Sequence, residues 1–514
     1  MKWWTLAAVC VATFMLLLDV TIVNVALPEI ERDLGATLSD LQWVINAYAV
    51  ALAAVLLTAG SLADRFGRRR LFALGLTVFS LASLACGLSG DPAMLIVSRA
   101  AQGLGGAAML ATALALLADA FRGSDRAVAL GLWGATTGAS VAIGPLVGGV
   151  IIEIASWHWI FLVNVPVGAF ALALTFARVR ESRDPNAGPV DVPGLVLFAI
   201  ALGGLTLGLH EAGERGWGDP LVVVVLVTAA VALVLFVAAE RRRARPMLDL
   251  ALFRKPTTSG ASLAVLALGG GVFALLLFLV LYLQNVLGYD ALGTGLRLLP
   301  FTIASFLAAG IGARLGQRVP LRTVIAAGLG IAGVGLLLMR GVHPGGEWTD
   351  LLGGFIVGGV GVGMLNPTIT AAALGVVGAA RAGMASGLNS TFRLAGVSIG
   401  VAALGTLFKD VAGSEARSLV PGPAGERLAE ALSSGEGPRA LASVPPDRRE
   451  AMARVAEQGF LAGLDSVMLA GALACLAGAV IALALVRRRD LVPAHEGLAP
   501  LPGAAPAPEA SPPA

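Results

Sequence analysis

The chain has 514 residues, of which 57% are hydrophobic and 13% are charged, and its mean hydropathy is +0.84. Soluble domains carry about 25% charged residues, so this chain lacks the polar side chains needed to cover a water-facing surface. We therefore expect lipid to be its outer solvent, and the net charge of +3 is too small to indicate a strongly charged partner.

Apolar windows of about 20 residues, the length of a membrane-crossing helix, recur along the chain. Helices are the expected element, because a lone strand cannot satisfy its backbone groups in lipid. The sequence thus predicts an all-α integral membrane protein with about 14 transmembrane helices. The predicted spans lie near residues 5–28, 41–61, 71–89, 93–119, 127–152, 159–178, 193–210, 219–239, 259–284, 294–313, 322–340, 350–376, 385–408 and 462–486.

The Lys and Arg residues fall mostly in alternate connections between these spans. The short connections on the other side hold only Arg32, Arg215 and Arg340. Because Lys and Arg are enriched in cytoplasmic loops, we expect both termini in the cytoplasm and the chain in the inner or plasma membrane. Segment 410–460 is polar and predicts an outer loop with a helical stretch near 446–458. The Pro- and Ala-rich residues 491–514 predict a disordered cytoplasmic tail.

A charged motif, G-S-L-A-D-R-F-G-R-R-R, connects the second and third spans from Gly60 onward. Two helices must reverse here within a short stretch, and Gly67 suits the tight turn. Asp64 is placed to pair with arginines such as Arg65 and Arg68 or to face the positive end of a helix. On residue types alone, a positively charged loop without further role explains the motif equally well.

This motif resembles the loop signature of the major facilitator superfamily, G-x-L-a-D-r-x-G-r-r. Other stretches are similar to motifs of the same superfamily, and residues 18–28 resemble the signature of its fourteen-span drug/proton antiporters. The resemblance covers about residues 1–490. The stretches are 18–28 (L-D-V-T-I-V-N-V-A-L-P), 99–105 (R-A-A-Q-G-L-G), 144–149 (G-P-L-V-G-G), 157–168 (W-H-W-I-F-L-V-N-V-P-V-G), 282–284 (Y-L-Q) and 387–393 (G-L-N-S-T-F-R).

The resemblance implies two six-helix bundles related by a pseudo-two-fold axis along the membrane normal, with two extra helices between them. Transporters of this kind hold their site near the middle of the membrane, between the repeats. Residues 312–318 read as a decayed copy of the loop motif, following the tenth span. The implied domains are an N-terminal bundle (1–180), an inserted helix pair with a cytoplasmic linker (181–256), a C-terminal bundle (257–490, with outer loop 410–460) and the tail (491–514).

Asp19 and Arg99 are the charged residues most difficult to explain by packing alone. A carboxylate inside the first span is unfavourable unless it meets water or a partner, and Arg99 is a permanently charged group in an apolar span. With the resemblance, we predict that Asp19 takes up and releases the coupling proton and that Arg99 tunes it through Gln102 or the first span. The alternatives are a structural carboxylate and an arginine that reaches the membrane surface.

Small residues and a proline mark the fifth span, where Gly144, Pro145, Gly148 and Gly149 fit close helix packing and bending. We assign them, with the loop motif, to conformational switching. The cargo is expected to contact apolar, aromatic and a few polar side chains. The candidates are Asn24, Trp43, Tyr48, Gln102, Phe273, Tyr282, Gln284, Asn366 and Arg393.

The expected function is that of a proton-coupled antiporter exporting lipophilic or cationic small molecules such as antibiotics and dyes. Members of the family it resembles that export dications carry a second acid in the second bundle. Spans 9–12 here lack a mid-membrane acid, so the resemblance implies a monocation or a neutral, lipophilic molecule as the cargo. A transporter of a physiological lipid, siderophore or metabolite remains an alternative, as does a non-transporting receptor.

The sequence also lacks the motifs of several other functions. It has no G-x-x-x-x-G-K-[ST] phosphate loop and no metal-ligand spacing, so we expect no enzyme activity, no metal and no cofactor beyond the proton gradient. The expected partners are a small molecule and the bilayer, without nucleic acid, and the chain is expected to act as a monomer.

Overall fold

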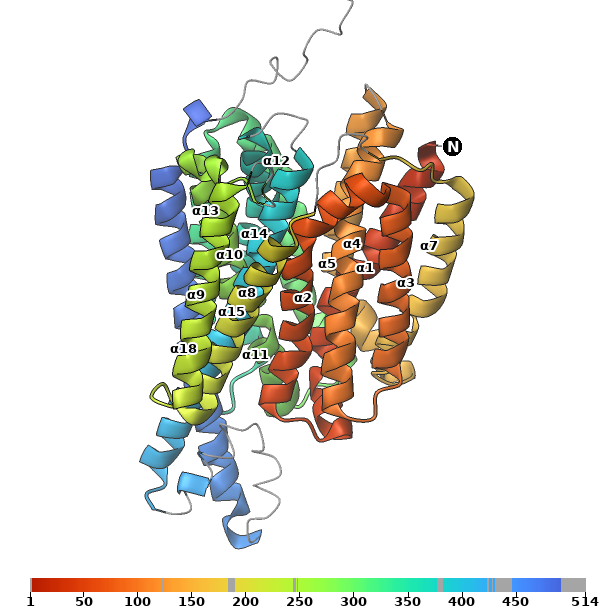
Figure 1. Cartoon of the computed structure of the whole chain (residues 1–514). Helices are drawn as coiled ribbons and strands as arrows, with labels where there is room; N and C mark the ends of the chain where they lie inside the picture. Colours follow the sequence, from red (N-terminus) through yellow and green to blue (C-terminus); the bar gives the residue numbers. More distant parts are fainter. Residues whose placement is uncertain are drawn as a thin grey trace, which may run out of the picture.

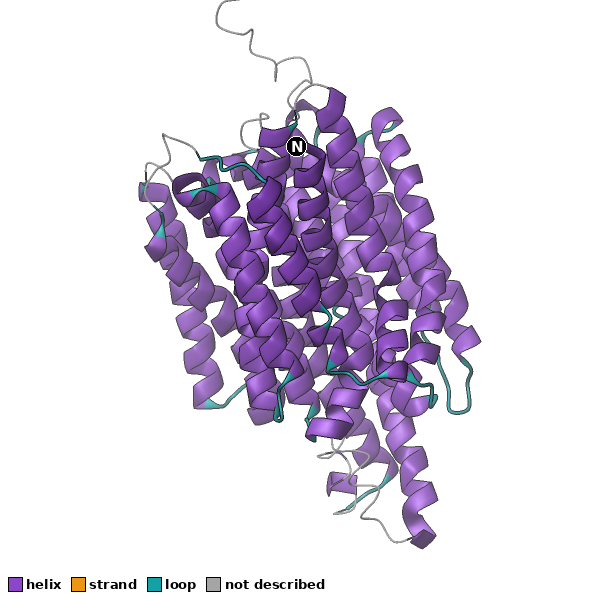
Figure 2. Ribbon diagram, turned by 90° about the vertical axis from the view of Figure 1, so that its right-hand side faces the viewer, coloured by secondary structure: helices purple, strands orange, loops and turns teal. Residues whose placement is uncertain are grey.

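The computed structural model describes residues 2–121, 124–183, 190–243, 246, 248–376, 382–422, 425–427, 429 and 446–490. These residues form helices joined by loops (Figure 2). The helices of the first half are α1 (Lys2–Leu34), α2 (Leu38–Phe66), α3 (Arg68–Gly87), α4 (Pro92–Ala120), α5 (Ser124–Ile154), α6 (Trp159–Leu162), α7 (Asn164–Arg178), α8 (Val192–Arg215) and α9 (Pro220–Arg242).

The second half contains α-helices together with shorter 3₁₀ and π segments. The 3₁₀ segments are η1 (Leu250–Arg254), η4 (Trp348–Leu351) and η6 (Arg488–Asp490), and the π segments are η2 (Gly269–Phe273) and η3 (Tyr282–Val286). The α-helices are α10 (Pro256–Leu268), α11 (Leu276–Leu281), α12 (Ala291–Arg318), α13 (Leu321–Leu338), α14 (Leu352–Gly375), α15 (Ala382–Leu419) and α18 (Pro446–Leu485).

The predicted all-helical fold and number of spans are confirmed. Within the described residues, 13 helical spans are long and apolar enough to cross a membrane, and α5, bent by 49°, raises the number to 14. The bend lies between Ser140 and Ile143, just before Pro145. A proline inside a helix removes a backbone hydrogen bond and clashes with the preceding turn, which explains the bend.

The helices form two bundles, α1–α7 and α10–α18 (Figure 1). In the first, α2 packs on α4, α3 on α4 and α1 on α5; in the second, α12 packs on α14, α13 on α14 and α10 on α15. These pairs recur in the same chain order, as the parallel repeat predicts. The inserted helix α8 packs on its neighbour α9 and also on α2 and α15, so it lies along the seam where the bundles meet.

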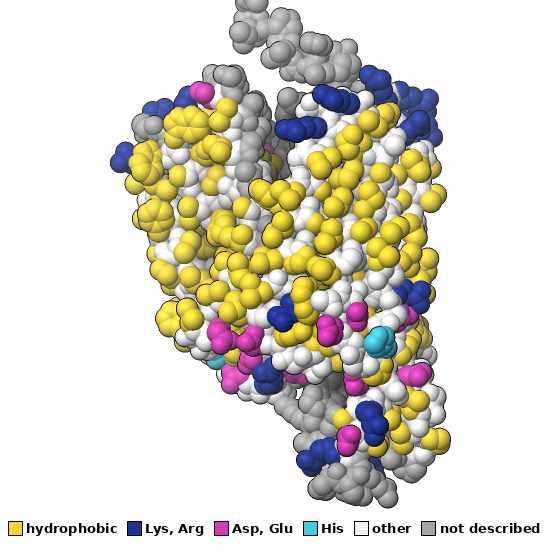
Figure 3. Space-filling model, turned by 180° about the vertical axis from the view of Figure 1, so that it is seen from behind, with side chains coloured by type: hydrophobic (Ala, Val, Ile, Leu, Met, Phe, Trp, Pro, Cys, Tyr) yellow, Lys and Arg dark blue, Asp and Glu magenta, His cyan; other side chains and the backbone are white. Residues whose placement is uncertain are grey.

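The two ends of the bundles differ in charge. Lys and Arg gather along the edge that is uppermost in Figure 3, and Asp and Glu gather toward the opposite one. We call these the arginine-rich edge and the opposite edge. Both described chain ends lie at the arginine-rich edge. The N-terminus is at the top of Figure 1, where Lys2 pairs with Asp125, and Asp490, which accepts from Thr257 at 2.7 Å, directly follows Arg487–Arg489.

Several helices extend further than the predicted spans. α15 continues to Leu419 and α18 begins at Pro446, so both project beyond the bundles at the lower end of Figure 1. The helix predicted near 446–458 is the first part of α18. Residues 312–318, expected to follow the tenth span, instead form the end of α12. The predicted tail, 491–514, lies outside the described residues.

Candidate functional site

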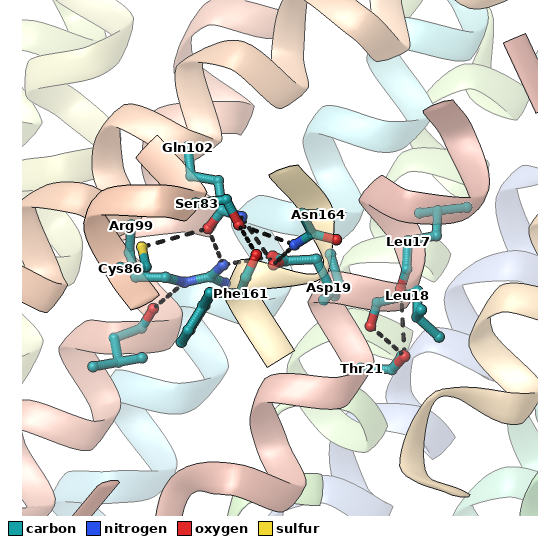
Figure 4. Close-up of polar contacts among 12 residues, drawn as sticks. Leu17, Leu18, Asp19, Thr21, Ser83, Cys86, Arg99, Gln102, Phe161 and Asn164 are labelled. Atoms are coloured by element: carbon teal, nitrogen blue, oxygen red, sulfur yellow. Dashed lines mark hydrogen bonds and ion pairs between the residues drawn. The ribbon is translucent and has the colours of Figure 1, made fainter. Parts of the chain in front are cut away.

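Asp19 lies at the middle of α1 with only 1% of its surface exposed. Its Oδ2 is 2.5 Å from Nη1 of Arg99, which extends from α4 and is 2% exposed (Figure 4). The structure therefore gives this carboxylate a partner, and in this state water does not reach it. Arg99 likewise reaches into the bundle and not to the membrane surface.

Amide and hydroxyl groups surround the other carboxylate oxygen. Gln102 and Asn164 donate to Asp19 Oδ1 at 2.9 and 3.2 Å, and both also donate to Ser83 Oγ at 3.2 and 3.0 Å. Ser83 in turn donates to the carbonyl of Phe161 at 2.9 Å. The network thus joins α1, α3, α4, α6 and α7, with two hydrogen bonds to the carboxylate and three that position the groups around it.

The guanidinium of Arg99 is also held from several sides. Its Nε donates to the Val44 carbonyl at 3.2 Å, and its Nη1 donates to Gln102 Oε1 at 2.6 Å. The ring of Tyr48 lies 4.2 Å from the guanidinium carbon, a cation–π distance. The positive charge therefore has an ion-pair partner, two oxygen acceptors and an aromatic face.

The sequence around Arg99 explains this local geometry. In R-A-A-Q-G-L-G, Arg99 and Gln102 lie one helical turn apart and share a face. Gly103 packs against α2 at Tyr48, and Gly105 packs against α3 at the Phe79 backbone. The absence of side chains at these glycines lets three helices approach closely enough for the short polar contacts.

The loop motif forms the turn between α2 and α3. Gly67 has φ of +109°, a conformation that residues with a Cβ rarely adopt. Asp64 accepts hydrogen bonds from Arg68, the shorter at 2.8 Å, whereas Arg65 is exposed and Gly60 faces open space. The motif therefore makes a turn stabilised by one ion pair between helix ends.

A carboxylate from outside the motif completes this turn. Glu181, which follows α7, accepts hydrogen bonds from the backbone nitrogens of Arg69 and Arg70 at 3.0 and 3.2 Å. These are the unpaired amides of the first turn of α3, where a negative charge is favourable. The contact links the end of the sixth span to the loop between the second and third.

The α5 residues act through packing. Gly144 and Gly148 lie against Thr21 and Ile22 of α1, and the Pro145 backbone lies against α12. A Cβ on Gly149 would lie 2.6 Å from the Ala291 carbonyl oxygen in the other bundle. These small residues bring α5 against both α1 and α12, and their role in conformational switching stays a prediction.

The predicted cargo residues of the first bundle do not form one cluster. Tyr48 and Gln102 belong to the Asp19–Arg99 network. Asn24 donates to the Val20 carbonyl of its own helix at 3.1 Å. Trp43 meets His210 of α8 edge to face, with ring centroids 5.4 Å apart.

Those of the second bundle are also dispersed. Gln284 donates across the interface to the Val25 carbonyl at 2.9 Å, while Phe273 and Tyr282 pack in the hydrophobic core. Asn366 Oδ1 and Arg393 Nε are buried atoms without a hydrogen-bond partner. Among the predicted cargo residues, Asn366 and Arg393 therefore lie apart from the Asp19–Arg99 network.

Sequence reasoning missed Ser83, Asn164 and Glu181. Asn164 lies in the W-H-W stretch, but an asparagine there does not by itself indicate a function. The signal that could have identified it is an amide side chain within an apolar stretch. Ser83 had no such signal, because serines are common in membrane helices and often bond their own backbone.

The fold and the buried charged network together define a multi-pass membrane transporter. The sequence profile of the Major Facilitator Superfamily matches residues 9–401, and the chain belongs to this superfamily.

Named relatives are similar over most of their length. The chain is 37% identical to the multidrug resistance protein Stp of Mycobacterium tuberculosis (strain CDC 1551 / Oshkosh), covering 90% of this chain and 88% of the relative. It is 35% identical to the tetracenomycin C resistance and export protein of Streptomyces glaucescens (93% and 90% covered). It is 38% identical to the puromycin resistance protein pur8 of Streptomyces alboniger (79% and 82% covered).

Among solved structures, the chain resembles a bacterial homologue of the human lysosomal transporter Spinster in an inward-facing, unoccupied conformation. The TM-score is 0.67 at 18% identity, with 96% of this chain and 99% of the other covered. At this identity the likeness shows the fold alone.

Proposed function

We propose that this protein exports lipophilic small molecules of the antibiotic or dye type in exchange for protons. The resistance and export proteins to which it is similar over most of their length support the direction and the class of cargo. We place it in the inner or plasma membrane with the arginine-rich edge toward the cytoplasm, because cytoplasmic loops are enriched in Lys and Arg.

The buried pair of Asp19 and Arg99 is the observation that carries the proton coupling. In the described state each charge neutralises the other inside the N-terminal bundle. Protonation of Asp19 removes one charge and leaves Arg99 buried without a counter-ion, a situation that costs about 3–5 kcal/mol in buried pairs. Uptake of a proton therefore favours an arrangement in which the pair separates and water reaches the guanidinium.

The contacts between bundles indicate which barrier such a rearrangement must open. Toward the opposite edge, Gly149 packs against Leu292, Gln284 donates to Val25, and Gly405 of α15 lies against α2. This half of the interface is closed. Export by alternating access requires these contacts to part while a barrier forms near the arginine-rich edge.

The test is transport in proteoliposomes with an imposed pH gradient and Nile red as a neutral lipophilic probe. We expect the wild-type protein to accumulate the dye in a manner abolished by a protonophore. Asp19→Asn should lose accumulation driven by the gradient but keep exchange of dye without one. Glu29→Gln is the matched control, because Glu29 lies on the same helix and pairs with Arg32 at the surface.

Two outcomes would contradict the proposal. Protonophore-insensitive accumulation by the wild-type protein would reject proton coupling. Unchanged gradient-driven transport by Asp19→Asn would reject Asp19 as the coupling acid. Since Asp19→Asn leaves Arg99 unpaired, the double variant with Arg99→Gln separates loss of coupling from loss of folding: it should be folded and remain uncoupled.

A further inference from the structure

Arg393 is a second arginine inside the membrane, and it lacks what Arg99 has. It lies in α15, where its backbone meets Gly269 midway along the ninth span. Its Nε is buried without a hydrogen-bond partner, and among the described residues its guanidinium has no acidic or aromatic partner. Within the described residues, no acidic side chain neutralises this positive charge in the membrane interior.

The helices from α10 to α14 offer no acid to neutralise this charge. α10, η2, α11, η3, α12, α13 and α14 contain no Asp or Glu. α2, α8 and α18 also pack on α15, but their acids Asp64, Glu211 and Asp465 pair with Arg68, Arg215 and Arg340. The nearest acid along α15 is Asp410, toward the opposite edge, and Asp19 of the other bundle is already bonded to Arg99. An arginine in a membrane span is unfavourable and ordinarily pairs or faces a water-filled cavity.

The packing of α15 indicates where Arg393 projects. Gly396 lies against Leu266 of α10, whereas Gly387 faces α2 and Leu394 packs on the core of the N-terminal bundle. At 3.6 residues per turn, Arg393 lies on the face between these two contact lines. Its side chain is therefore directed toward the space between the bundles, and it is only partly exposed there.

Other features of this region fit a ligand site. The backbone of α10 widens into the π segment η2 beside Arg393, and such segments occur frequently at functional sites. On the same side of α15, Asn389 Oδ1 and Thr258 Oγ1 are buried without partners and line a cavity that extends toward the arginine-rich edge. Arg393 does not itself line this small cavity, but Asn389 lies one helical turn before it on α15, so three buried polar atoms without partners lie on neighbouring parts of α10 and α15.

We propose that Arg393 recognises the cargo and that the cargo is a lipophilic organic anion, with a carboxylate, sulfonate or phenolate group. Guanidinium groups bind planar oxyanions through paired, charge-assisted hydrogen bonds. A bound anion would neutralise the unpaired charge, whereas a monocation would add to it. This inference rests on the proposed export function and replaces the monocation expected from the sequence with an anion.

The test compares three lipophilic probes of different charge: 1-anilinonaphthalene-8-sulfonate (anion), Nile red (neutral) and tetraphenylphosphonium (cation). Binding to the purified full-length protein in nanodiscs and gradient-driven transport in proteoliposomes are both measured. We expect Arg393→Gln to bind the sulfonate about tenfold more weakly or worse, since a hydrogen bond to a charged group contributes about 1.5–3 kcal/mol. Nile red binding should be unchanged, and Arg393→Lys should retain part of the sulfonate binding.

Arg322→Gln, an exposed arginine at the start of α13, is the matched control and should behave as wild type. Equal sulfonate binding by wild type and Arg393→Gln, or tighter binding of tetraphenylphosphonium than of sulfonate by wild type, would overturn the inference. If Arg393→Gln weakened the binding of all three probes equally, the substitution would have disturbed the structure as a whole, and the inference would also be overturned. If wild type binds the sulfonate through Arg393 but transports no probe, export fails while the anion site stands.

Discussion

The two bundles repeat one packing scheme but treat their buried charge differently. In the N-terminal bundle, Asp19 and Arg99 neutralise each other, and Gln102, Asn164 and Ser83 satisfy the remaining hydrogen bonds. In the C-terminal bundle, Arg393 has no acidic or aromatic partner among the described residues. A repeat can thus retain its helix packing while the buried arginine of one half has an ion-pair partner and that of the other half has none among the described residues.

The difference suggests a division of tasks. A balanced pair can change its charge by one proton and so drive a rearrangement, whereas an unpaired guanidinium can recognise something that enters from outside. Each of the following substitutions tests whether the protein distinguishes its two halves in this way.

The largest effect is expected for Asp19→Asn. Removing one partner of a buried ion pair costs about 3–5 kcal/mol, because the other charge remains buried. The midpoint of unfolding of the purified protein in micelles should therefore fall strongly. The double variant with Arg99→Gln should regain much of the lost stability. If the single and double variants were equally destabilised, the pair would not be the unit that holds this network.

Asn164→Ala should have an intermediate effect. It leaves Asp19 Oδ1 and Ser83 Oγ with fewer donors, and an unsatisfied buried group costs about 1–3 kcal/mol. The matched substitution in the other bundle is Asn389→Ala, which removes an oxygen without a partner. If Asn164→Ala and Asn389→Ala were equally destabilising in the same unfolding assay, the proposed difference between the two bundles would be contradicted.

Arg393→Gln is expected to leave the free energy of unfolding unchanged or to raise it by up to about 1 kcal/mol. The substitution removes a buried charged donor without a partner, and with it the cost of desolvating that donor. The same unfolding measurement, without any ligand, checks this. A loss comparable to that of Asp19→Asn would mean that Arg393 is structurally paired in the membrane and not reserved for cargo.

Asp465→Asn should have the smallest effect. Asp465 pairs with Arg340 at 2.6 Å near the opposite edge, but both side chains are about a third exposed. Exposed pairs contribute roughly 0.2–1 kcal/mol, and the stabilisation should fall further as salt is added. A salt-independent loss of several kcal/mol would contradict this difference between exposed and buried pairs.

Much of the fold was predictable because membrane spans have a strong sequence signal: length, hydropathy and the asymmetry of arginines. Helix ends were less predictable. α15 and α18 extend beyond the apolar windows that predict membrane spans. A helix can continue into water, because polar residues also form its backbone hydrogen bonds, so the end of an apolar window does not mark the end of a helix.

The site was predictable in part. The spacing of Arg99 and Gln102, and the position of Asp19, follow from helix periodicity and from the rarity of charge in lipid. The contributions of Ser83 and Asn164 depend on how three other helices rotate against α1, which no local pattern encodes. That Arg393 has no ion-pair partner among the described residues likewise depends on how the neighbouring helices are placed, which the sequence does not show.

Whether Asp19 exchanges its proton in the working protein is the question on which the proton-coupling account depends. It is tested most directly by infrared difference spectroscopy of the membrane-reconstituted protein, following the C=O stretch of protonated carboxyl groups as the pH is lowered and restored. We predict a reversible band in the wild-type protein and in Glu29→Gln that is missing in Asp19→Asn. An identical band in Asp19→Asn would show that the carboxylate stays ionised beside Arg99 throughout, and would contradict coupling at this residue.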